Sequence, residues 1–181
     1  MSLEQNSICK GMVTFPNGEQ RWYVDRKLHR LDGPAIVHRI YNKWYVNGKL
    51  HRLDGPAITY SDGSEEWYVN GKLHRLDGPA VTHRRGYNEW YMNGKLHRLG
   101  GPAIVYSDGS EEWYVNGKLH RLDGPAITYP DGSKKWYVNG VSKICIDEDY
   151  EDDEEEESDE DYEDDDEEEE ESDEEEKNDK N

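Results

Sequence analysis

The sequence WYVNGKLHRLDGPAITY stands at residues 44–60 and returns unchanged at residues 113–129. Variants of it recur along the chain, and their leading tryptophans are spaced by 22 residues once and by 23 residues four times. The six tryptophans are Trp22, Trp44, Trp67, Trp90, Trp113 and Trp136. A fixed period of this size is typical of repeat arrays, in which each small unit buries its apolar surface only against its neighbours. The period therefore predicts a repeat protein and argues against a single-core enzyme.

Each unit contains two turn signals, which in the unit at residues 55–75 are Asp62-Gly63 and Asn70-Gly71. Both dipeptides are flanked by β-favouring residues and are preferred in two-residue type I′ hairpin turns, where both turn positions need a positive φ. Two such turns per unit predict an antiparallel meander, and no stretch of the chain shows a helical period. We therefore expect an all-β fold, an elongated single-layer array of antiparallel hairpins.

The two turns also predict a strand register, because a two-residue loop fixes which residues face each other. The expected pairs are Tyr60 with Glu65, Thr59 with Glu66, Ile58 with Trp67, Val69 with Lys72, Tyr68 with Leu73, and Trp67 with His74. Alternation then places Ile58, Tyr60, Trp67, Val69 and His74 on one face, and Ala57, Thr59, Glu66, Tyr68, Leu73 and Arg75 on the other. We expect the tryptophan face to be buried, with successive indoles lying against one another. On the opposite face we expect Glu66 to pair with Arg75.

A third turn is predicted at the sequence Leu-Asp-Gly-Pro, found at residues 76–79 and at equivalent positions. Proline removes a ladder donor and glycine permits an unusual φ, so the sheet must bend or break there. Gly100 stands where the other four copies carry aspartate. This exception indicates that the aspartate forms the turn and is not an indispensable chemical group.

The C-terminal part of the chain differs sharply from the repeats in charge. Residues 147–181 hold 27 of the 42 acidic residues and two basic ones, so this segment carries about −25 and the remainder about +5. It has too few apolar residues to offset the entropy cost of folding, which predicts disorder. We therefore divide the chain into an N-terminal segment (1–10), an array of about six hairpins (11–146) and a disordered polyacidic tail (147–181).

The tail has several candidate roles. Ser158 and Ser172 each precede acidic residues in a pattern that acid-directed kinases accept, so both are candidate phosphorylation sites. The tail is interpreted either as a solubiliser, as a segment that captures a basic, histone-like partner, or as one that folds back onto basic side chains of the array. Because it directly follows the last strand, it would also oppose end-to-end pairing, and truncation at Asp147 is expected to raise self-association.

The repeats resemble the MORN repeat family in their period, in the Asn-Gly-Lys turn at residues 116–118 and in the stretch TYPDGSK at residues 128–134. The match covers about residues 11–140 and is closest to a MORN-like variant with units WYxNGKLHRxDGPA, of the type found in large DNA viruses of amoebae. Two features depart from the family, because Trp-Tyr-Val replaces the usual start and Leu-Asp-Gly-Pro-Ala replaces the Gly-x-Gly after the turn. The resemblance implies a hairpin-repeat fold that binds phospholipid head groups, further copies of itself or other proteins.

A histidine recurs in the full units, at His29, His51, His74, His97 and His120. Equivalent residues of adjacent units lie about 9.6 Å apart if each unit adds two strands, whereas zinc ligands lie about 2.0–2.3 Å from the metal. Two members of the column therefore cannot share an ion, and we expect each ring to pack beside a tryptophan with a nitrogen bonded locally.

We predict no metal and no cofactor. We also predict no enzyme activity, because catalysis needs different residues that converge on one point.

Two basic columns run along the predicted array. They consist of Arg30, Arg52, Arg75, Arg98 and Arg121, and of Lys27, Lys49, Lys72, Lys95 and Lys118. Such columns bind phosphate-rich surfaces, or they are neutralised within the repeat by Asp32, Asp54, Asp77 and Asp123. The small net charge of the repeats favours neutralisation.

The sequence thus predicts a non-catalytic scaffold that mediates protein–protein interaction or assembly, encoded by a large virus if the resemblance holds. The candidate binding surface comprises Tyr45, Tyr68, Tyr91, Tyr114, Leu50, Leu73, Leu96, Leu119, Arg52, Arg75, Arg98 and Arg121. Alternatives are anionic membrane phospholipids bound through the Lys and Arg columns, and a basic protein bound by the tail; no base-reading module indicates a specific nucleic acid.

Cys9 and Cys145 form no disulfide framework. No signal peptide or apolar run of about 18 residues is present, which predicts a cytoplasmic protein, in the host cytoplasm or the virion if viral.

Overall fold

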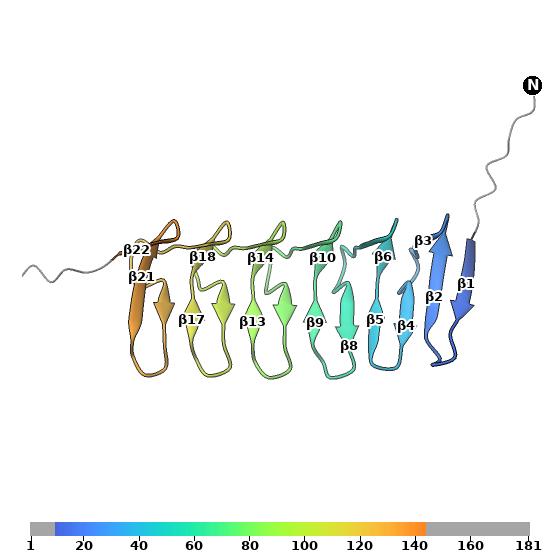
Figure 1. Ribbon diagram of the computed structural model, residues 1–181, viewed down its shortest axis with the longest axis horizontal. Helices are drawn as coiled ribbons and strands as arrows, with labels where there is room; N and C mark the ends of the chain where they lie inside the picture. The colour runs from blue at the N-terminus through green and yellow to red at the C-terminus, as the bar shows by residue number, and fades with distance from the viewer. Residues whose placement is uncertain (1–9, 144–181) are drawn as a thin grey trace, which may run out of the picture. The chain divides into compact units, whose positions relative to one another are not determined.

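The computed structural model describes residues 10–143, and these residues form strands and turns without any helix (Figure 1). The main element is an open antiparallel sheet of 14 strands, in which hairpins stand side by side in chain order. Four two-stranded hairpins lie along one edge of this array (Figure 1). The predicted all-β, single-layer hairpin array is therefore confirmed, while the polyacidic tail lies outside the described residues.

The strands of the long sheet form six hairpins. These are β1 (Lys10–Thr14) with β2 (Gln20–Val24), β4 (Ile36–His38) with β5 (Tyr41–Lys43), β8 (Ile58–Tyr60) with β9 (Glu65–Glu66), β12 (Val81–Thr82) with β13 (Asn88–Glu89), β16 (Ile104–Val105) with β17 (Glu111–Glu112), and β20 (Ile127–Thr128) with β21 (Lys134–Val138). Two further strands extend the sheet, β3 (Lys27–Leu28) beside β2 and β22 (Val141–Lys143) beside β21.

The Asn-Gly turns close the short hairpins. These are β6 (Tyr45–Val46) with β7 (Lys49–Leu50), β10 (Tyr68–Val69) with β11 (Lys72–Leu73), β14 (Tyr91–Met92) with β15 (Lys95–Leu96), and β18 (Tyr114–Val115) with β19 (Lys118–Leu119). Asn70 and Gly71 have φ of 53° and 80°, which is the positive pair that a type I′ turn requires. Tyr68 accordingly faces Leu73, so the predicted register of this hairpin is confirmed.

The Asp-Gly turns differ from the prediction by one residue. The Tyr60 N–H donates to the Ser64 carbonyl, so the loop has three residues, and only its last member, Gly63, has a positive φ, of 90°. This geometry is a type I turn followed by a glycine bulge. The Asp62 carboxylate accepts the Ser64 N–H at 2.9 Å and stabilises the loop.

The longer loop shifts the pairing of the two strands by one residue. Ile58 faces Glu66 and Thr59 faces Glu65, instead of the predicted pairs. Because a shift of one residue moves every side chain to the other face, Ile58, Tyr60 and Glu66 share the face of Tyr68. Ile58 and Tyr60 therefore lie opposite Trp67, and the predicted face composition was wrong.

At the four inner tryptophans, Trp44, Trp67, Trp90 and Trp113, the strand is interrupted and the chain passes from the long sheet to a short hairpin. Trp67 does not pair with Ile58; its N–H donates to the carbonyl of Ala80 in the next unit at 2.7 Å, while its carbonyl accepts the His74 N–H. Equivalent bonds join Trp22, Trp44, Trp90 and Trp113 to alanines of the following units. Each hairpin is thus hydrogen-bonded to its successor at the level of the tryptophan.

The buried core is a narrow column of alanine and isoleucine. Its members are Ala35, Ile36, Ala57, Ile58, Ala80, Ala103, Ile104, Ala126 and Ile127. Ala57, predicted to lie on the exposed face, is fully buried at the point where its carbonyl accepts the Trp44 N–H of the preceding unit. The tryptophans themselves are only half-buried.

Residues 10–143 contain no helix with the length and apolarity needed to cross a bilayer.

Candidate interaction surfaces

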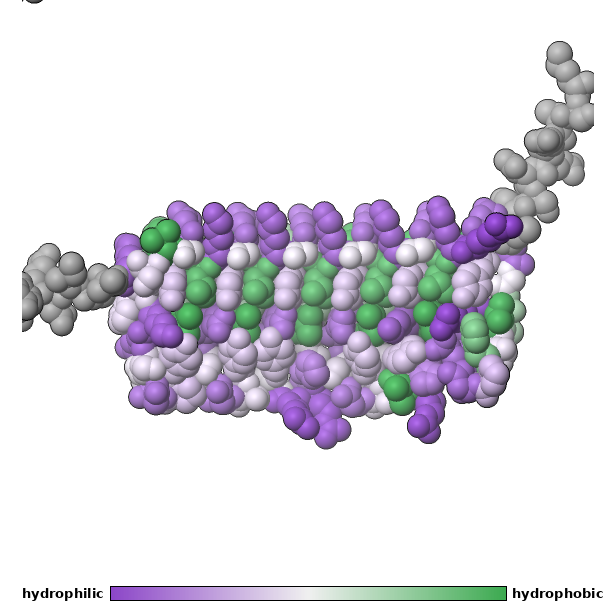
Figure 2. Space-filling view, in the orientation of Figure 1, coloured by the Kyte–Doolittle hydropathy of each residue, from purple (hydrophilic) through white to green (hydrophobic). Residues whose placement is uncertain are grey.

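Tyrosine and leucine alternate along one face of the array, which we call the Tyr–Leu face. It consists of Tyr45, Tyr68, Tyr91, Tyr114, Leu50, Leu73, Leu96 and Leu119, and each tyrosine faces a leucine across its short hairpin. All eight side chains are half-buried. Figure 2 views this face, where apolar and paler bands alternate along the array. The structure thus brings eight of the twelve predicted surface residues together.

Glutamates join tyrosines of adjacent strands on this face. The Glu66 carboxylate accepts hydrogen bonds from the hydroxyls of Tyr60 and Tyr68, both at 2.8 Å. Burial, followed by the hydrogen bond to Glu66, raises the pKa of Tyr60 to about 12 and that of Tyr68 still further. Glu112 bonds in the same way to Tyr106 and Tyr114. These hydroxyls donate to carboxylates, so their oxygens remain free to accept a hydrogen bond.

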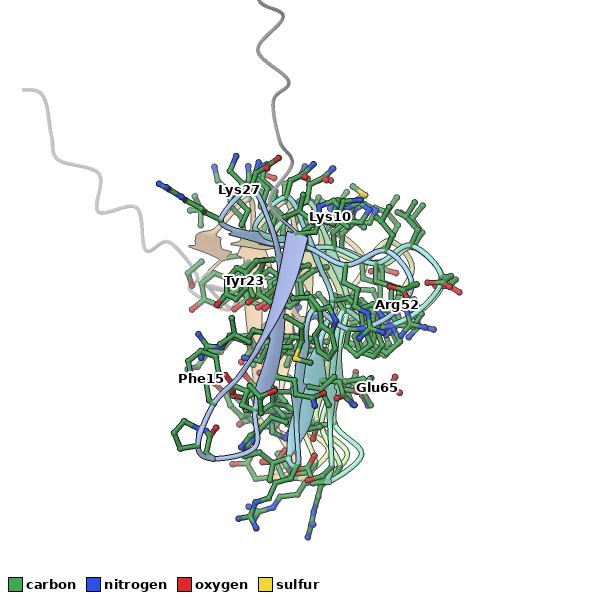
Figure 3. The ribbon with its side chains drawn as sticks, turned by 90° about the vertical axis from the view of Figure 1, so that its right-hand side faces the viewer. Lys10, Phe15, Tyr23, Lys27, Arg52 and Glu65 are labelled. Carbon is green, nitrogen blue, oxygen red and sulfur yellow. The ribbon has the colours of Figure 1, made fainter. Side chains whose placement is uncertain are left out.

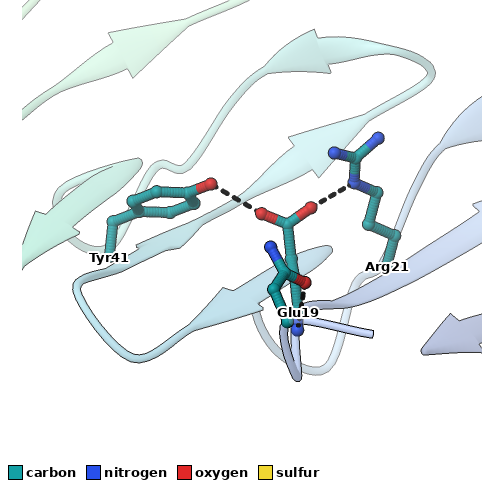
Figure 4. A network of polar contacts seen from close by, with 4 residues as sticks. Glu19, Arg21 and Tyr41 are labelled. Atoms are coloured by element: carbon teal, nitrogen blue, oxygen red, sulfur yellow. Dashed lines mark hydrogen bonds and ion pairs between the residues drawn. The ribbon is translucent and has the colours of Figure 1, made fainter. Parts of the chain in front are cut away.

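A variant of this arrangement occurs at the N-terminal end, where Glu19 is almost fully buried (Figure 4). Its carboxylate accepts the Tyr41 hydroxyl at 2.6 Å and the Nε–H of Arg21. The hydrogen bond from Tyr41 is the main cause that lowers the pKa of Glu19, and Arg21 acts in the same direction against the opposing effect of burial. Both carboxylate oxygens are therefore satisfied, as a buried charge requires.

The arginines lie on the other side of the sheet. Arg75 Cζ lies 3.9 Å from the centroid of the Trp67 ring, and its Nε and Nη1 donate to Asp77 and to the Pro79 carbonyl. Tyr23 and Arg52 mark the two opposite sides in Figure 3. The same stacking places Arg30, Arg52, Arg98 and Arg121 on Trp22, Trp44, Trp90 and Trp113. The arginines predicted for the binding surface thus lie on the side of the sheet opposite the Tyr–Leu face.

Two further predictions, on the partner of Glu66 and on the stacking of the tryptophan rings, were also wrong. Glu66 does not pair with Arg75, because the register places Glu66 among tyrosines and Arg75 on tryptophan. Five of the six tryptophan rings stack on an arginine, and no indole–indole pair occurs among residues 10–143. The interpretation that aspartate neutralises the arginine column is confirmed for Arg30, Arg52, Arg75 and Arg121.

The close approach of arginine explains the glycine of the Leu-Asp-Gly-Pro turn. A Cβ on Gly55 would lie 2.7 Å from the Arg52 Cζ, so any larger residue would displace the guanidinium. Arg98, where Gly100 replaces the aspartate, still stacks on Trp90 at 4.0 Å and donates to the Pro102 carbonyl. The Arg–Trp stack and the hydrogen bond from arginine to the proline carbonyl are therefore kept even where the aspartate is missing.

The histidine column joins neighbouring units. The Asn93 backbone N–H donates to the Nδ1 of His74 at 3.1 Å, and equivalent bonds link His29, His51, His97 and His120 to Asn47, Asn70, Asn116 and Asn139. The ring nitrogen is thus bonded as expected, although its partner is the turn of the next unit. Residues 10–143 hold no group of three or more His, Cys, Asp or Glu that would suit a metal ion.

The lysine column forms a ridge along one edge of the array, visible as the hydrophilic row at the top of Figure 2. Lys27, Lys49, Lys72, Lys95 and Lys118 are exposed. Each aliphatic stem lies over the turn glycine of the next unit, as between Lys49 Cβ and Gly71, where an added Cβ would lie 3.7 Å away. Within the described part of the chain, none of the five lysines has an ion-pair partner.

The Leu-Asp-Gly-Pro turns expose a leucine in every copy, a feature that the sequence reasoning overlooked. Leu31, Leu53, Leu76, Leu99 and Leu122 are 76–80% exposed. Their recurrence at one position of each unit was the available signal, because a purely structural turn has no need of a large apolar side chain there. Grooves lie between two pairs of successive turns.

Ser158, Ser172 and the basic partner predicted for the tail lie outside the described residues. The chain matches no family model, and no curated protein sequence matches it. The resemblance to MORN repeats therefore stays a prediction, and what the structure itself establishes is an open antiparallel array of hairpin repeats.

Proposed function

We propose that this protein is a non-catalytic scaffold that binds another protein through the Tyr–Leu face. The observation that supports the proposal is the separation of the two sides of the sheet. Arginine, tryptophan and aspartate are engaged with one another on one side. The other side offers a continuous band of half-buried tyrosine and leucine, and residues 10–143 form no second layer over it. Tyrosine is enriched at protein interfaces, where charged residues are depleted from the centre.

The chemistry of the face indicates what its partner carries. Glu66 and Glu112 hold negative charge among tyrosines, whose hydroxyl oxygens can still accept hydrogen bonds. An apolar surface with a few Arg side chains would match this pattern, because a guanidinium donates to several acceptors and stacks on aromatic rings. The partner proposed is therefore a protein surface of this kind.

The test compares two triple variants of the full chain. The first is Leu50→Lys, Leu73→Lys and Leu96→Lys, and the matched control is Lys49→Ser, Lys72→Ser and Lys95→Ser on the same strands. Proteins captured by the wild-type chain are quantified, and the leading one is purified for calorimetric titration. The proposal requires at least a tenfold loss of affinity with the leucine variant and wild-type affinity with the control. Equal affinity for both variants, with circular dichroism unchanged, would rule out the Tyr–Leu face.

A second candidate function is attachment to anionic membranes through the lysine ridge. It is favoured by the alignment of five exposed lysines on one edge without ion-pair partners among residues 10–143. Each lysine near an anionic surface contributes about 1 kcal/mol. Flotation with vesicles of phosphatidylcholine and phosphatidylserine tests it. Salt-sensitive flotation that the Lys49→Ser, Lys72→Ser, Lys95→Ser variant loses would support this function, and absence of flotation at low salt would exclude it.

A further inference from the structure

The Leu-Asp-Gly-Pro turns, together with Leu-Gly-Gly-Pro at residues 99–102, form a row of ridges on the arginine side of the sheet, and grooves lie between two pairs of successive ridges. The groove between the turns at 31–34 and 53–56 has a volume of about 550 Å³ and is lined by Leu31, Trp44, Val46, His51 and Leu53, among others. The groove between the turns at 76–79 and 99–102 has about 540 Å³ and is lined by the equivalent Leu76, Trp90, Met92, His97 and Leu99. We call these the turn grooves.

Each turn groove is lined by both apolar and charged side chains. In the first, Trp44 and Val46 line the groove together with the exposed leucines of the two turns. Arg52, whose guanidinium stacks on the Trp44 ring, and Asp54, whose side chain is 85% exposed, line it too. Asp54 accepts the Nε–H of Arg52 through Oδ1, so its second oxygen faces solvent. A groove of this construction suits an apolar side chain flanked by a basic one.

The spacing of the turn grooves selects the conformation of a ligand. Each unit adds two strands to the sheet, so successive turns are about 9.6 Å apart, and the two turn grooves, which lie two units apart, are separated by about 19 Å. A polyproline II helix has three residues per turn and a rise of about 3.1 Å, so every third side chain points the same way at intervals of about 9.3 Å. A β-strand places same-side residues about 6.6 Å apart, and an α-helix repeats after two turns at about 10.8 Å. Over four units, the side-chain repeat of a polyproline II helix falls short of the repeat of the turns by about 1.2 Å. The two-turn repeat of an α-helix exceeds it by about 4.8 Å.

We propose that the turn grooves bind an extended segment of another protein in the polyproline II conformation, with an apolar residue at every third position and basic residues between. One apolar side chain enters each groove, between two exposed leucines. Basic side chains of the ligand meet Asp32, Asp54, Asp77 and Asp123, all of which are 79–85% exposed. Such a segment has no internal hydrogen bonds, and its carbonyls accept from Arg Nη2, since Nε and Nη1 of Arg52 are already bonded within the turn.

Binding of labelled synthetic peptides to the full chain tests the proposal. The first probe is a fifteen-residue peptide of five Leu-Pro-Lys triplets, and the second has the same composition with irregular leucine spacing. Since both carry the same charge, their nonspecific attraction to the acidic tail is equal, and only the spacing distinguishes them. Fluorescence anisotropy at physiological salt should give at least a tenfold higher affinity for the regular peptide. Equal affinities, or no binding of either peptide, would overturn the proposal.

A chain variant locates the site. Leu53→Ser, Leu76→Ser and Leu99→Ser should abolish the preference for the regular peptide, and because these side chains are exposed, circular dichroism should stay unchanged. The variant Leu50→Lys, Leu73→Lys, Leu96→Lys on the Tyr–Leu face should retain the preference. Retention of the preference in the Leu53, Leu76, Leu99 variant would contradict the proposal. So would a wild-type dimer that this variant converts to a monomer in sedimentation, because the ridges would then bind a second copy.

Discussion

The guanidinium of Arg75 stacks on the ring of Trp67, eight residues earlier in the chain, at 3.9 Å. This contact holds the turn at residues 76–79 against Trp67, the residue at which the preceding strand is interrupted. The arginine also bonds to Asp77 and to the Pro79 carbonyl. The charge of the stacked arginine is therefore used inside the repeat, whereas the lysine ridge is exposed and has no ion-pair partner among residues 10–143.

The Arg–Trp stack should contribute measurably to stability. Arg75→Lys keeps the charge but loses the planar stack and the forked hydrogen bonds. We expect the free energy of unfolding in urea to fall by about 1–2 kcal/mol. Lys72→Arg, on the exposed ridge, serves as the control and should change it by less than about 0.5 kcal/mol. Equal effects of both substitutions would show that the stack does not hold the turn.

The tyrosines of the Tyr–Leu face should titrate unusually. Burial and the hydrogen bond to Glu66 raise the pKa of Tyr60 to about 12, and burial together with Glu112 raises that of Tyr106 to about 12. Since both values exceed the unfolded value of about 10, these groups contribute stability that is complete below about pH 10 and is lost as the pH rises toward 12. Ultraviolet titration of tyrosinate, with the urea midpoint at each pH, measures this.

A substitution separates the two causes of the tyrosine shift. Glu66→Gln removes the charge and leaves the burial, so the pKa of Tyr60 should fall toward its ordinary value without reaching it. Glu65→Gln, on the other side of the same strand, is the control. Titration of all the tyrosines near their ordinary pKa in the wild-type protein would show that the hydroxyls are not held as described.

Glu19 should make the N-terminal hairpin sensitive to acid. The hydrogen bond from Tyr41 is the largest cause that lowers its pKa from 4.5. The group therefore contributes stability that is present above the unfolded pKa and is lost as the pH falls through the lower, folded one. Glu19→Gln should reduce the free energy of unfolding at neutral pH by about 1–3 kcal/mol and flatten its dependence on pH below 4.5. An unchanged pH dependence in the variant would assign the acid sensitivity to other carboxylates.

The histidine column should couple neighbouring units. His74→Ala removes the acceptor for the Asn93 N–H and should lower the free energy of unfolding by about 0.5–1.5 kcal/mol. His83→Ala, at an exposed position outside the column, should have less effect. Amide exchange at Asn93 provides a second readout, because it should accelerate only in the His74 variant. A matching acceleration in both variants would refute the inter-unit bond.

The sequence predicted the hairpin array and the Asn-Gly register because those signals are local. Asn70 and Gly71 both adopt a positive φ, as that dipeptide favours, and Tyr68 pairs with Leu73 as expected. Asp62-Gly63 was less informative, since the same dipeptide ends a three-residue loop in which only glycine needs a positive φ. The choice between the two loops depends on the Asp62–Ser64 bond and on pairing with neighbouring units.

The positions of the candidate surface residues could be predicted only in part, for the same physical reason. Tyr68 and Leu73 belong to one short hairpin, so their shared face follows from local alternation. Arg75 lies beyond the end of that hairpin, where alternation no longer applies, and its position is set by Trp67 and Asp77. The turn grooves need two consecutive units to exist, so no single unit of sequence displays them.

Residue-resolved amide hydrogen exchange of the full chain tests the central claim most directly, namely that successive hairpins are joined into one array with two distinct sides. The N–H groups of Trp44, Trp67, Trp90 and Trp113 donate to alanines of the following units at 2.7–2.8 Å. They should be strongly protected, and to a similar extent, while the N–H of Leu76 in the exposed turn should exchange quickly. Tryptophan amides that exchange as fast as Leu76 would show that the hairpins are not joined, and the account would be contradicted.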